Sequence, residues 1–484
     1  MDKSYLAEVI KTMKEHEQSD FIPFLKSPYF NNGAHKIEVQ NLFLIFIDKM
    51  SLPHDLKKED IYEMLYPEAP FVEGKVEKLM VELNKLVRTY LLINKYLSIE
   101  NEFQYNLDLS KIFRARGMES KYHQIINKLS SMQVKEKRKK KDYYLRQYLL
   151  DNEKHDLEND NNRQKGDLNI PNAIYNLDMF YLFEKIELFN RILLQQKVTN
   201  LEFSAYISNE INSFKIPLEC HQEGPAFEIA IKIFLLLKSD MPKIEEFEEL
   251  ADLLKGNETD IEPSLLQTYY TYLRNICTMM SNSGLYDLKH LLFELQKEHL
   301  SRGYLYINGR ITHSAFSNTV NLATRMKEHQ WAYNFIETHK DLIIGEDSNK
   351  DYYYLNLSRY YFATSQFNEA LDILPLSFPE PDYNNLARRL ELKIYYETDS
   401  PLLAYKIDSF KMFISRASHK YLPLQKREYQ NNFINLLYQI TQSISKDKTR
   451  SERLIQRINA KKFVTDREWL LEKAVEIATG KNKR

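Results

Sequence analysis

The chain contains little glycine and little proline. Its 484 residues include 11 glycines and 15 prolines, whereas average usage of about 7% and about 5% predicts about 34 and about 24. Glycine forms phosphate-binding loops and tight hairpins, and proline marks loops. The scarcity of both residues favours many helices joined by short connections, and no glycine-rich phosphate loop is present in the sequence.

Cysteine is also scarce. Cys220 and Cys277 are the two cysteines, which excludes a cysteine-rich metal site and a disulfide scaffold and suits a reducing compartment. The 12 histidines are scattered, and no HExxH motif is present. We therefore predict no metal, no cofactor and no catalytic residues, and we interpret the chain as a protein that is not an enzyme. An enzyme whose catalytic residues converge from distant positions is the alternative.

The chain has almost no net charge and no long apolar run. Lysine and arginine number 67 and aspartate and glutamate 68, so no overall field draws the chain to nucleic acid or to an anionic membrane. The N-terminal segment is charged and has no apolar signal core. The apolar run Leu42–Ile47 is too short to span a bilayer. We predict a soluble cytoplasmic protein that does not contact a membrane.

Amphipathic helical patterns fill most of the chain. Apolar residues within 76–97 recur at steps of three and four, which is typical of one buried face on a long helix. Residues 227–237, FEIAIKIFLLL, are apolar on nearly every side and predict a central helix. The 33 tyrosines and 26 phenylalanines suit thin helical layers with partly exposed surfaces. These patterns predict an all-α fold.

The stretch Asp351–Leu374 shows the clearest pair of helices. Tyr354, Leu357 and Tyr361 recur at steps of three and four, which places them on one face of a helix. The small residue Ser358 leaves room for a neighbouring helix to approach closely. A short break follows, and apolar residues then form the inner face of a second helix: Phe367, Ala370, Leu371 and Leu374.

The order of residues in this stretch resembles a tetratricopeptide (TPR) repeat: aromatic, Leu, small residue, Tyr, break, aromatic, Ala. The TPR module is a pair of antiparallel helices, 34 residues long, that stacks into a right-handed superhelix. Ala404 lies 34 residues after Ala370. The TPR pattern has a glycine near the end of the first helix, where this chain has Ser365. The resemblance implies an α-solenoid whose concave face binds a protein or peptide.

A wider resemblance rests on five segments that occur together in this order. They are FLKSPYFN at 24–31, NGRITHSAFSNTVNLA at 308–323, the helix pair described above, ARRLELKIYYE at 387–397 and REWLLEK at 467–473. Together they resemble an uncharacterised Bacteroidetes family of long all-helical, TPR-like repeat proteins. This resemblance implies a fold and no catalytic residues.

We divide the chain into four parts. Residues 1–156 form an N-terminal helical region that ends in a long basic helix. For residues 157–172, which hold five asparagines, a glycine and a proline, we predict a break between helical regions. Residues 173–300 contain degenerate helix pairs. Residues 301–484 contain TPR-like repeats and a C-terminal capping helix, for which we predict Asp466 as the N-cap.

A run of basic residues suggests nucleic-acid binding as an alternative to the binding of a protein or peptide. The residues that carry its charge are Lys137, Arg138, Lys139, Lys140 and Lys141. We place them on one long helix, or on two helices with a kink, where the segment 135–148 also carries tyrosines. A basic run beside aromatic residues can bind phosphates and stack bases, but on a helix these charges spread around the cylinder and are typical of a solvated face.

We therefore predict a non-enzymatic helical-repeat scaffold that binds a protein or peptide partner. The alternative is a protein that binds nucleic acid, or an acidic partner, through the basic helix. The identity of the partner and the oligomeric state are left open.

Overall fold

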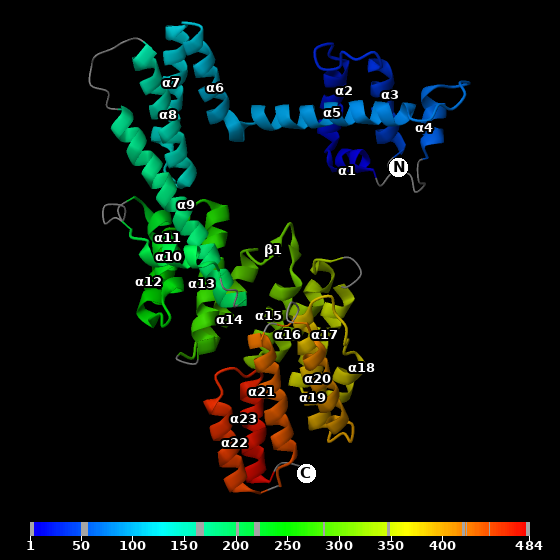
Figure 1. Ribbon diagram of the computed structural model, residues 1–484, viewed down its shortest axis with the longest axis vertical. Helices are drawn as coiled ribbons and strands as arrows, with labels where there is room; N and C mark the ends of the chain where they lie inside the picture. The colour runs from blue at the N-terminus through cyan, green and yellow to red at the C-terminus, as the bar shows by residue number, and fades with distance from the viewer. Residues whose placement is uncertain are drawn as a thin grey trace. The chain divides into compact units, whose positions relative to one another are not determined.

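The chain is almost entirely helical (Figure 1). The computed structural model describes residues 4–49, 57–160, 169–199, 203–216, 223–283, 286–345, 349–418, 422, 424–444 and 446–480. Within these ranges it contains 23 α-helices and one two-stranded hairpin, which confirms the all-α prediction. None of the described helices has the length and apolarity needed to cross a membrane.

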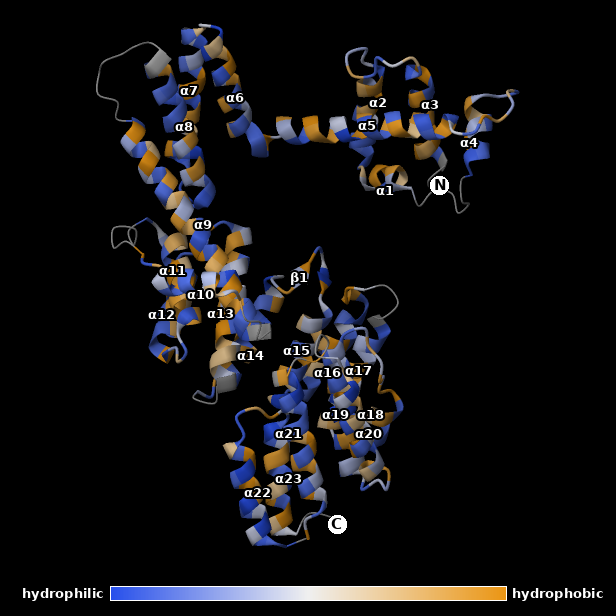
Figure 2. Cartoon of the chain, viewed as in Figure 1, coloured by the Kyte–Doolittle hydropathy of each residue, from blue (hydrophilic) through white to orange (hydrophobic). Residues whose placement is uncertain are grey.

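The chain forms two compact units. Unit 1 comprises Met1–Lys185 and Ile216–Ala226, and unit 2 comprises Ile186–Lys215 and Phe227–Arg484. Half of the predicted break at 157–172, residues 161–168, lies outside the described residues. The other half is helical, because α8 ends at Asp160 and α9 begins at Asn169. In both units, polar and apolar residues alternate along the helices (Figure 2), as expected for helices that each bury one face.

Unit 1 contains eight helices and the first half of a ninth. They are α1 (Tyr5–Thr12), α2 (Glu15–Lys26), α3 (Lys36–Lys49), α4 (Lys58–Leu65), α5 (Lys75–Leu97), α6 (Glu102–Ala115), α7 (Glu119–Lys135), α8 (Lys141–Asp160) and α9 (Asn169–Thr199). Helices α1 to α5 share one hydrophobic core, and α6, α7 and α8 share a second one.

Helix α5 carries the apolar face predicted for residues 76–97. This face is buried from Val76 to Tyr90, where the tyrosine hydroxyl donates a hydrogen bond to the Glu17 carbonyl of α2 at 3.0 Å. Leu97, at the end of the helix, is 59% exposed. The first part of the helix is therefore an internal contact, and its last turns are not covered by the described residues of unit 1.

Four of the five residues of the basic run lie outside the helices, and the fifth, Lys141, begins α8. Helix α7 ends at Lys135 and α8 begins at Lys141, so residues 136–140 form the connection between the two helices. Like charges one turn apart destabilise a helix, and five consecutive cations concentrate this repulsion. Of the two alternatives that we predicted, the single long helix is wrong: the segment forms two helices, with most of the basic residues in the connection between them.

Unit 2 contains the remaining elements. They are α10 (Ala205–Ser213), α11 (Pro225–Lys238), α12 (Ile244–Gly256), α13 (Pro263–Ser283), α14 (Lys289–Ser301), β1 (Tyr306–Ile307), β2 (Arg310–Ile311), α15 (His313–Arg325), α16 (His329–His339), α17 (Asn349–Ala363), α18 (Phe367–Asp372), α19 (Pro381–Glu397), α20 (Leu403–Arg416), α21 (Leu424–Thr441), α22 (Lys448–Ala460) and α23 (Arg467–Thr479). Helix α11 is buried on most sides, as its sequence predicts.

In three successive helix pairs of unit 2, the two helices are joined by the same type of turn. The pairs are α15 with α16, α17 with α18, and α19 with α20. Each turn contains one residue with positive φ: Lys327 at 61°, Ser365 at 63° and Asp399 at 48°. The next amide donates to the carbonyl five residues earlier, in the bonds Glu328 to Ala323 (3.0 Å), Gln366 to Tyr361 (2.8 Å) and Ser400 to Tyr395 (2.9 Å). This is the Schellman motif, which normally uses glycine.

Helix α17 is more deeply buried than its sequence predicts. It packs against α15, α16, α18 and α19, so Tyr352 and Leu355 are buried as well as Leu357, while Tyr354 is 40% exposed. Ser358 is fully buried, and its hydroxyl donates to the Ala370 carbonyl of α18 at 2.6 Å. The close approach predicted at this small residue is confirmed.

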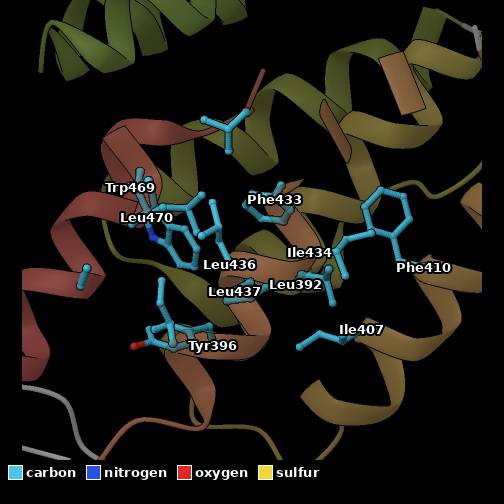
Figure 3. Packing of buried hydrophobic residues seen from close by; sticks show 14 of the residues in the cluster. Leu392, Tyr396, Ile407, Phe410, Phe433, Ile434, Leu436, Leu437, Trp469 and Leu470 are labelled. Atoms are coloured by element: carbon cyan, nitrogen blue, oxygen red, sulfur yellow. The ribbon is translucent and has the colours of Figure 1, made fainter. Parts of the chain in front are cut away.

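The C-terminal helices close around a core that contains Trp469 (Figure 3). The indole of Trp469 meets Tyr396 of α19 edge to face, with 5.4 Å between ring centroids. Phe433 and Leu437 of α21 belong to the same core. This packing fixes α23 beside α19 and α21, and so it fixes the charged residues at the start of α23.

Candidate functional site

A polar cleft in unit 2 is the strongest candidate site. It has a volume of about 1230 Å³ and is lined by α15, α17 and α19 on one side and by residues 459–473 on the other. Its lining includes ten lysines and arginines but five aspartates and glutamates. Small-molecule sites usually measure about 300–1,000 Å³, so the cleft is large enough for an extended ligand.

Three cations line the cleft at a constant spacing in the sequence. Arg325 of α15, Arg359 of α17 and Lys393 of α19 lie 34 residues apart, and all three line the cleft. Each belongs to the first helix of its pair. Equal spacing in repeated helix pairs places side chains on equivalent faces. This ladder of three cations is the sequence signal that could have predicted the cleft. A comparison of apolar positions alone, on which our sequence prediction rests, does not detect it.

Asp466 binds two cations of α19. Its carboxylate accepts from Arg389 Nε at 2.9 Å and from Lys393 Nζ at 2.8 Å. Burial opposes ionisation, but these two cations hold the pKa of Asp466 well below its usual value. Asp466 stands at the N-cap position with a φ of 51°, and its side chain makes no capping hydrogen bond. The predicted N-cap position is therefore confirmed, but the side chain does not cap the helix, because the two cations take the carboxylate.

Glu468 binds two further cations. Its Oε1 accepts from Lys289 Nζ at 2.5 Å and from Arg325 Nη2 at 3.0 Å. Although burial acts in the opposite direction, these contacts lower the pKa of Glu468. Two residues apart in the sequence, Asp466 and Glu468 therefore each hold a pair of cations.

Arg359 lies between these ion pairs and has no carboxylate partner among the described residues. Its guanidinium donates to the Ser317 carbonyl at 3.3 Å and to the side-chain oxygen of Asn321. Burial, together with the nearby charges of Arg389 and Arg325, lowers the pKa of Arg359 to about 10, and Asp466 acts in the opposite direction. The residue stays cationic at neutral pH, in a region where positive charges repel one another.

A second network closes the cleft beside Trp469. The indole Nε1 donates to Glu397 Oε1 at 2.8 Å, and the buried Lys473 donates to the same oxygen at 2.9 Å. Lys473 also contacts Glu476 at 2.9 Å. Burial disfavours its charge, but these carboxylates raise the pKa of Lys473. Glu397 and Lys473 are therefore paired with each other, whereas Arg359 has no carboxylate partner among the described residues.

The five residues of the basic run lie in unit 1, and they do not form one surface of free charges. Lys139 contacts Glu223 at 3.7 Å, Lys140 contacts Asp142 at 3.6 Å, and Lys141 contacts Glu184 at 2.6 Å. Lys137 and Arg138 are exposed.

The tyrosines beside the run differ in access. Tyr144 is buried, and its hydroxyl donates to Glu223 at 3.0 Å. Burial raises the pKa of Tyr144 well above its usual value. This ring is not available to stack on a base, whereas Tyr143 is partly exposed.

The described residues show no cluster of three or more His, Cys, Asp or Glu side chains that could hold a metal ion. Cys277 is buried on α13, and burial raises the pKa of its thiol to about 12. A thiol in this environment is a poor nucleophile. Cys220 lies outside the described residues.

Comparison with family models, with curated proteins and with solved structures finds no match to this chain. The arguments for its function therefore rest on its own residues.

Proposed function

We propose that this chain is a non-enzymatic helical-repeat scaffold that binds a protein or peptide partner. The cleft of unit 2 supports the proposal. Three of the helices that line it, α15, α17 and α19, are the first helices of successive pairs, as expected if stacked repeats build an extended binding surface. The TPR-like α-solenoid and a cytoplasmic location belong to the same proposal, the second because two cysteines in 484 residues suit a reducing compartment.

Affinity capture with and without nuclease tests the proposal. The tagged full chain is expressed in its host, and the captured proteins are compared with those held by Ala363→Trp, a bulky substitution at the end of α17 inside the cleft. Ala115→Trp is the matched control, since it makes the same change at the exposed end of α6.

We expect a specific protein that survives nuclease treatment, that is retained by Ala115→Trp and that is lost with Ala363→Trp. Equal capture by both variants would place the partner away from the cleft. Capture of no specific protein by the wild-type chain would count against the scaffold itself.

The alternative proposal is nucleic-acid binding at the basic run, and the exposure of Lys137 and Arg138 favours it. Replacing both residues with Glu should weaken binding to a labelled oligonucleotide and flatten its salt dependence, since each phosphate contact contributes to that slope. Oligonucleotide binding that is unchanged by both salt concentration and the substitutions would rule out nucleic-acid binding at the basic run. The ion pairs of Lys139, Lys140 and Lys141 make it the weaker of the two.

A further inference from the structure

The cations of the cleft outnumber the carboxylates that contact them. Arg389 and Lys393 share the carboxylate of Asp466, and Lys289 and Arg325 share one oxygen of Glu468. Arg359 contacts neutral oxygens. These five cations therefore face two carboxylates, and an excess of three positive charges remains in this part of the cleft.

Such an excess is costly in a partly buried site unless an anion relieves it. Charges removed from water need paired partners, and Arg359 has given up part of its hydration for three neutral acceptors, on Ser317, Asn356 and Asn321. A guanidinium has five N–H donors in a planar fork that matches a carboxylate. The ladder of Arg325, Arg359 and Lys393 repeats this positive charge along three neighbouring helices.

We propose that the cleft binds an acidic peptide segment, whose Asp and Glu side chains pair with Arg359 and with neighbouring cations of the ladder. The inference rests on the proposed scaffold function and names the chemistry of its partner. Asp466 and Glu468 show within the chain itself how a carboxylate sits between two of these cations. The partly buried Phe362 also lines the cleft and provides apolar contact area for the rest of the peptide.

Glu468 sets how many cations are available. Its side chain is 56% exposed, and Arg325, which it holds, is 40% exposed. A carboxylate of the partner therefore competes with Glu468 for Arg325 and Lys289 at the surface. Removing the charge of Glu468 should strengthen peptide binding, while removing Arg325 or Arg359 should weaken it.

Selection from a random peptide library tests the inference without a known partner. Random dodecapeptides displayed on phage are selected on the immobilised full-length chain, and the most enriched peptide is synthesised with and without its Asp and Glu replaced by Asn and Gln. We expect selected peptides enriched in Asp and Glu over the input library, and a large loss of affinity for the neutral version.

Charge variants then locate the binding surface. Losing one charge-assisted contact should weaken the acidic peptide about 10–100-fold in Arg359→Gln and Arg325→Gln. Glu468→Gln should tighten it. Arg453→Gln is the matched control, because Arg453 is exposed on α22 of the same unit and does not line the cleft. If Arg359→Gln does not fold, the two exposed positions, Arg325 and Glu468, carry the test.

The possible failures are distinct. Selected peptides without acidic enrichment, or an affinity that is the same in Arg325→Gln, Glu468→Gln and Arg453→Gln, would overturn the acidic partner and leave the scaffold function standing. Selection of no peptide above an empty support would defeat both. Single-stranded DNA that displaces the acidic peptide at equal concentration would assign the cleft to nucleic acid and overturn the inference.

Discussion

His299 should make unit 2 sensitive to acid. It lies in the last turn of α14 with 0% of its surface exposed, and neither ring nitrogen is hydrogen-bonded to a described residue. The rings of Tyr270 and Tyr304 pack around it at centroid distances of 5.4 and 5.9 Å. Burial first, and then the charges of Arg274 and Arg302, lower the pKa of His299 to about 3.

The sign and size of the effect follow from proton binding. Unfolded His299, with its ordinary pKa of 6.5, takes up a proton below that pH, whereas the folded side chain stays neutral until about pH 3. Its contribution to stability is therefore present above pH 6.5 and is lost as the pH falls. The loss is about 1 kcal/mol at pH 5.5 and about 3 kcal/mol at pH 4.5, at about 1.36 kcal/mol per pH unit.

Urea unfolding at a series of pH values measures this loss. Both tryptophans of the chain, Trp331 and Trp469, lie in unit 2, so their fluorescence reports this unit, and urea adds no ions that would screen charges. Other carboxylates also respond to acid, and the comparison is therefore made against His299→Phe, which cannot bind the proton.

The difference in unfolding free energy between the wild type and His299→Phe should change by about 3 kcal/mol in favour of the variant between pH 7.5 and pH 4.5. His290→Gln, at an exposed position on the same helix, should follow the wild type. Parallel pH profiles for wild type and His299→Phe would refute the reasoning, since they would mean that His299 binds its proton equally well in the folded and unfolded chains.

Three further changes test other parts of unit 2. Asp466→Asn should cost about 3–5 kcal/mol in urea unfolding at pH 7, because it leaves Arg389 and Lys393 without their carboxylate; an unchanged midpoint would show that the pair contributes nothing. Trp331→Ala should cost about 3 kcal/mol, since Trp331 stacks on Phe335 at 5.5 Å, and a loss below about 0.5 kcal/mol would mean an uncoupled surface ring. Ser365→Gly should raise stability by up to about 1 kcal/mol by relieving its positive φ, and a destabilised variant in thermal unfolding would contradict this.

The sequence predicted the local structure well because helical periodicity depends on residues that are close together in the sequence. The face of α5 from Val76 to Tyr90 and the close contact at Ser358 both follow from steps of three and four. The basic run was misplaced because periodicity does not count the repulsion between adjacent cations. The basic run is polar and contains no turn-forming residues. Such a composition is compatible both with a helix and with a connection between helices.

The cleft was out of reach for a different reason. The ion pairs of Asp466 join residues more than 70 positions apart, and no local pattern reports which distant side chain will lie opposite. Asp466 has the sequence context of an N-cap, and tertiary packing directed its carboxylate elsewhere. The ladder was visible in principle, since Arg325, Arg359 and Lys393 share the 34-residue spacing expected of a TPR-like repeat.

The Schellman turns at Lys327, Ser365 and Asp399 show how the shortage of glycine affects the unfolded chain. Each of these residues accepts a strained left-handed backbone that costs about 1–2 kcal/mol. A glycine would avoid this strain, but it would also enlarge the denatured ensemble by about 0.5–1 kcal/mol of conformational freedom. Much of the backbone strain in the native state is thus offset by the lower conformational entropy of the unfolded chain. The chain gives up little net stability, and its nascent turns sample fewer wrong conformations while the helices on either side are forming.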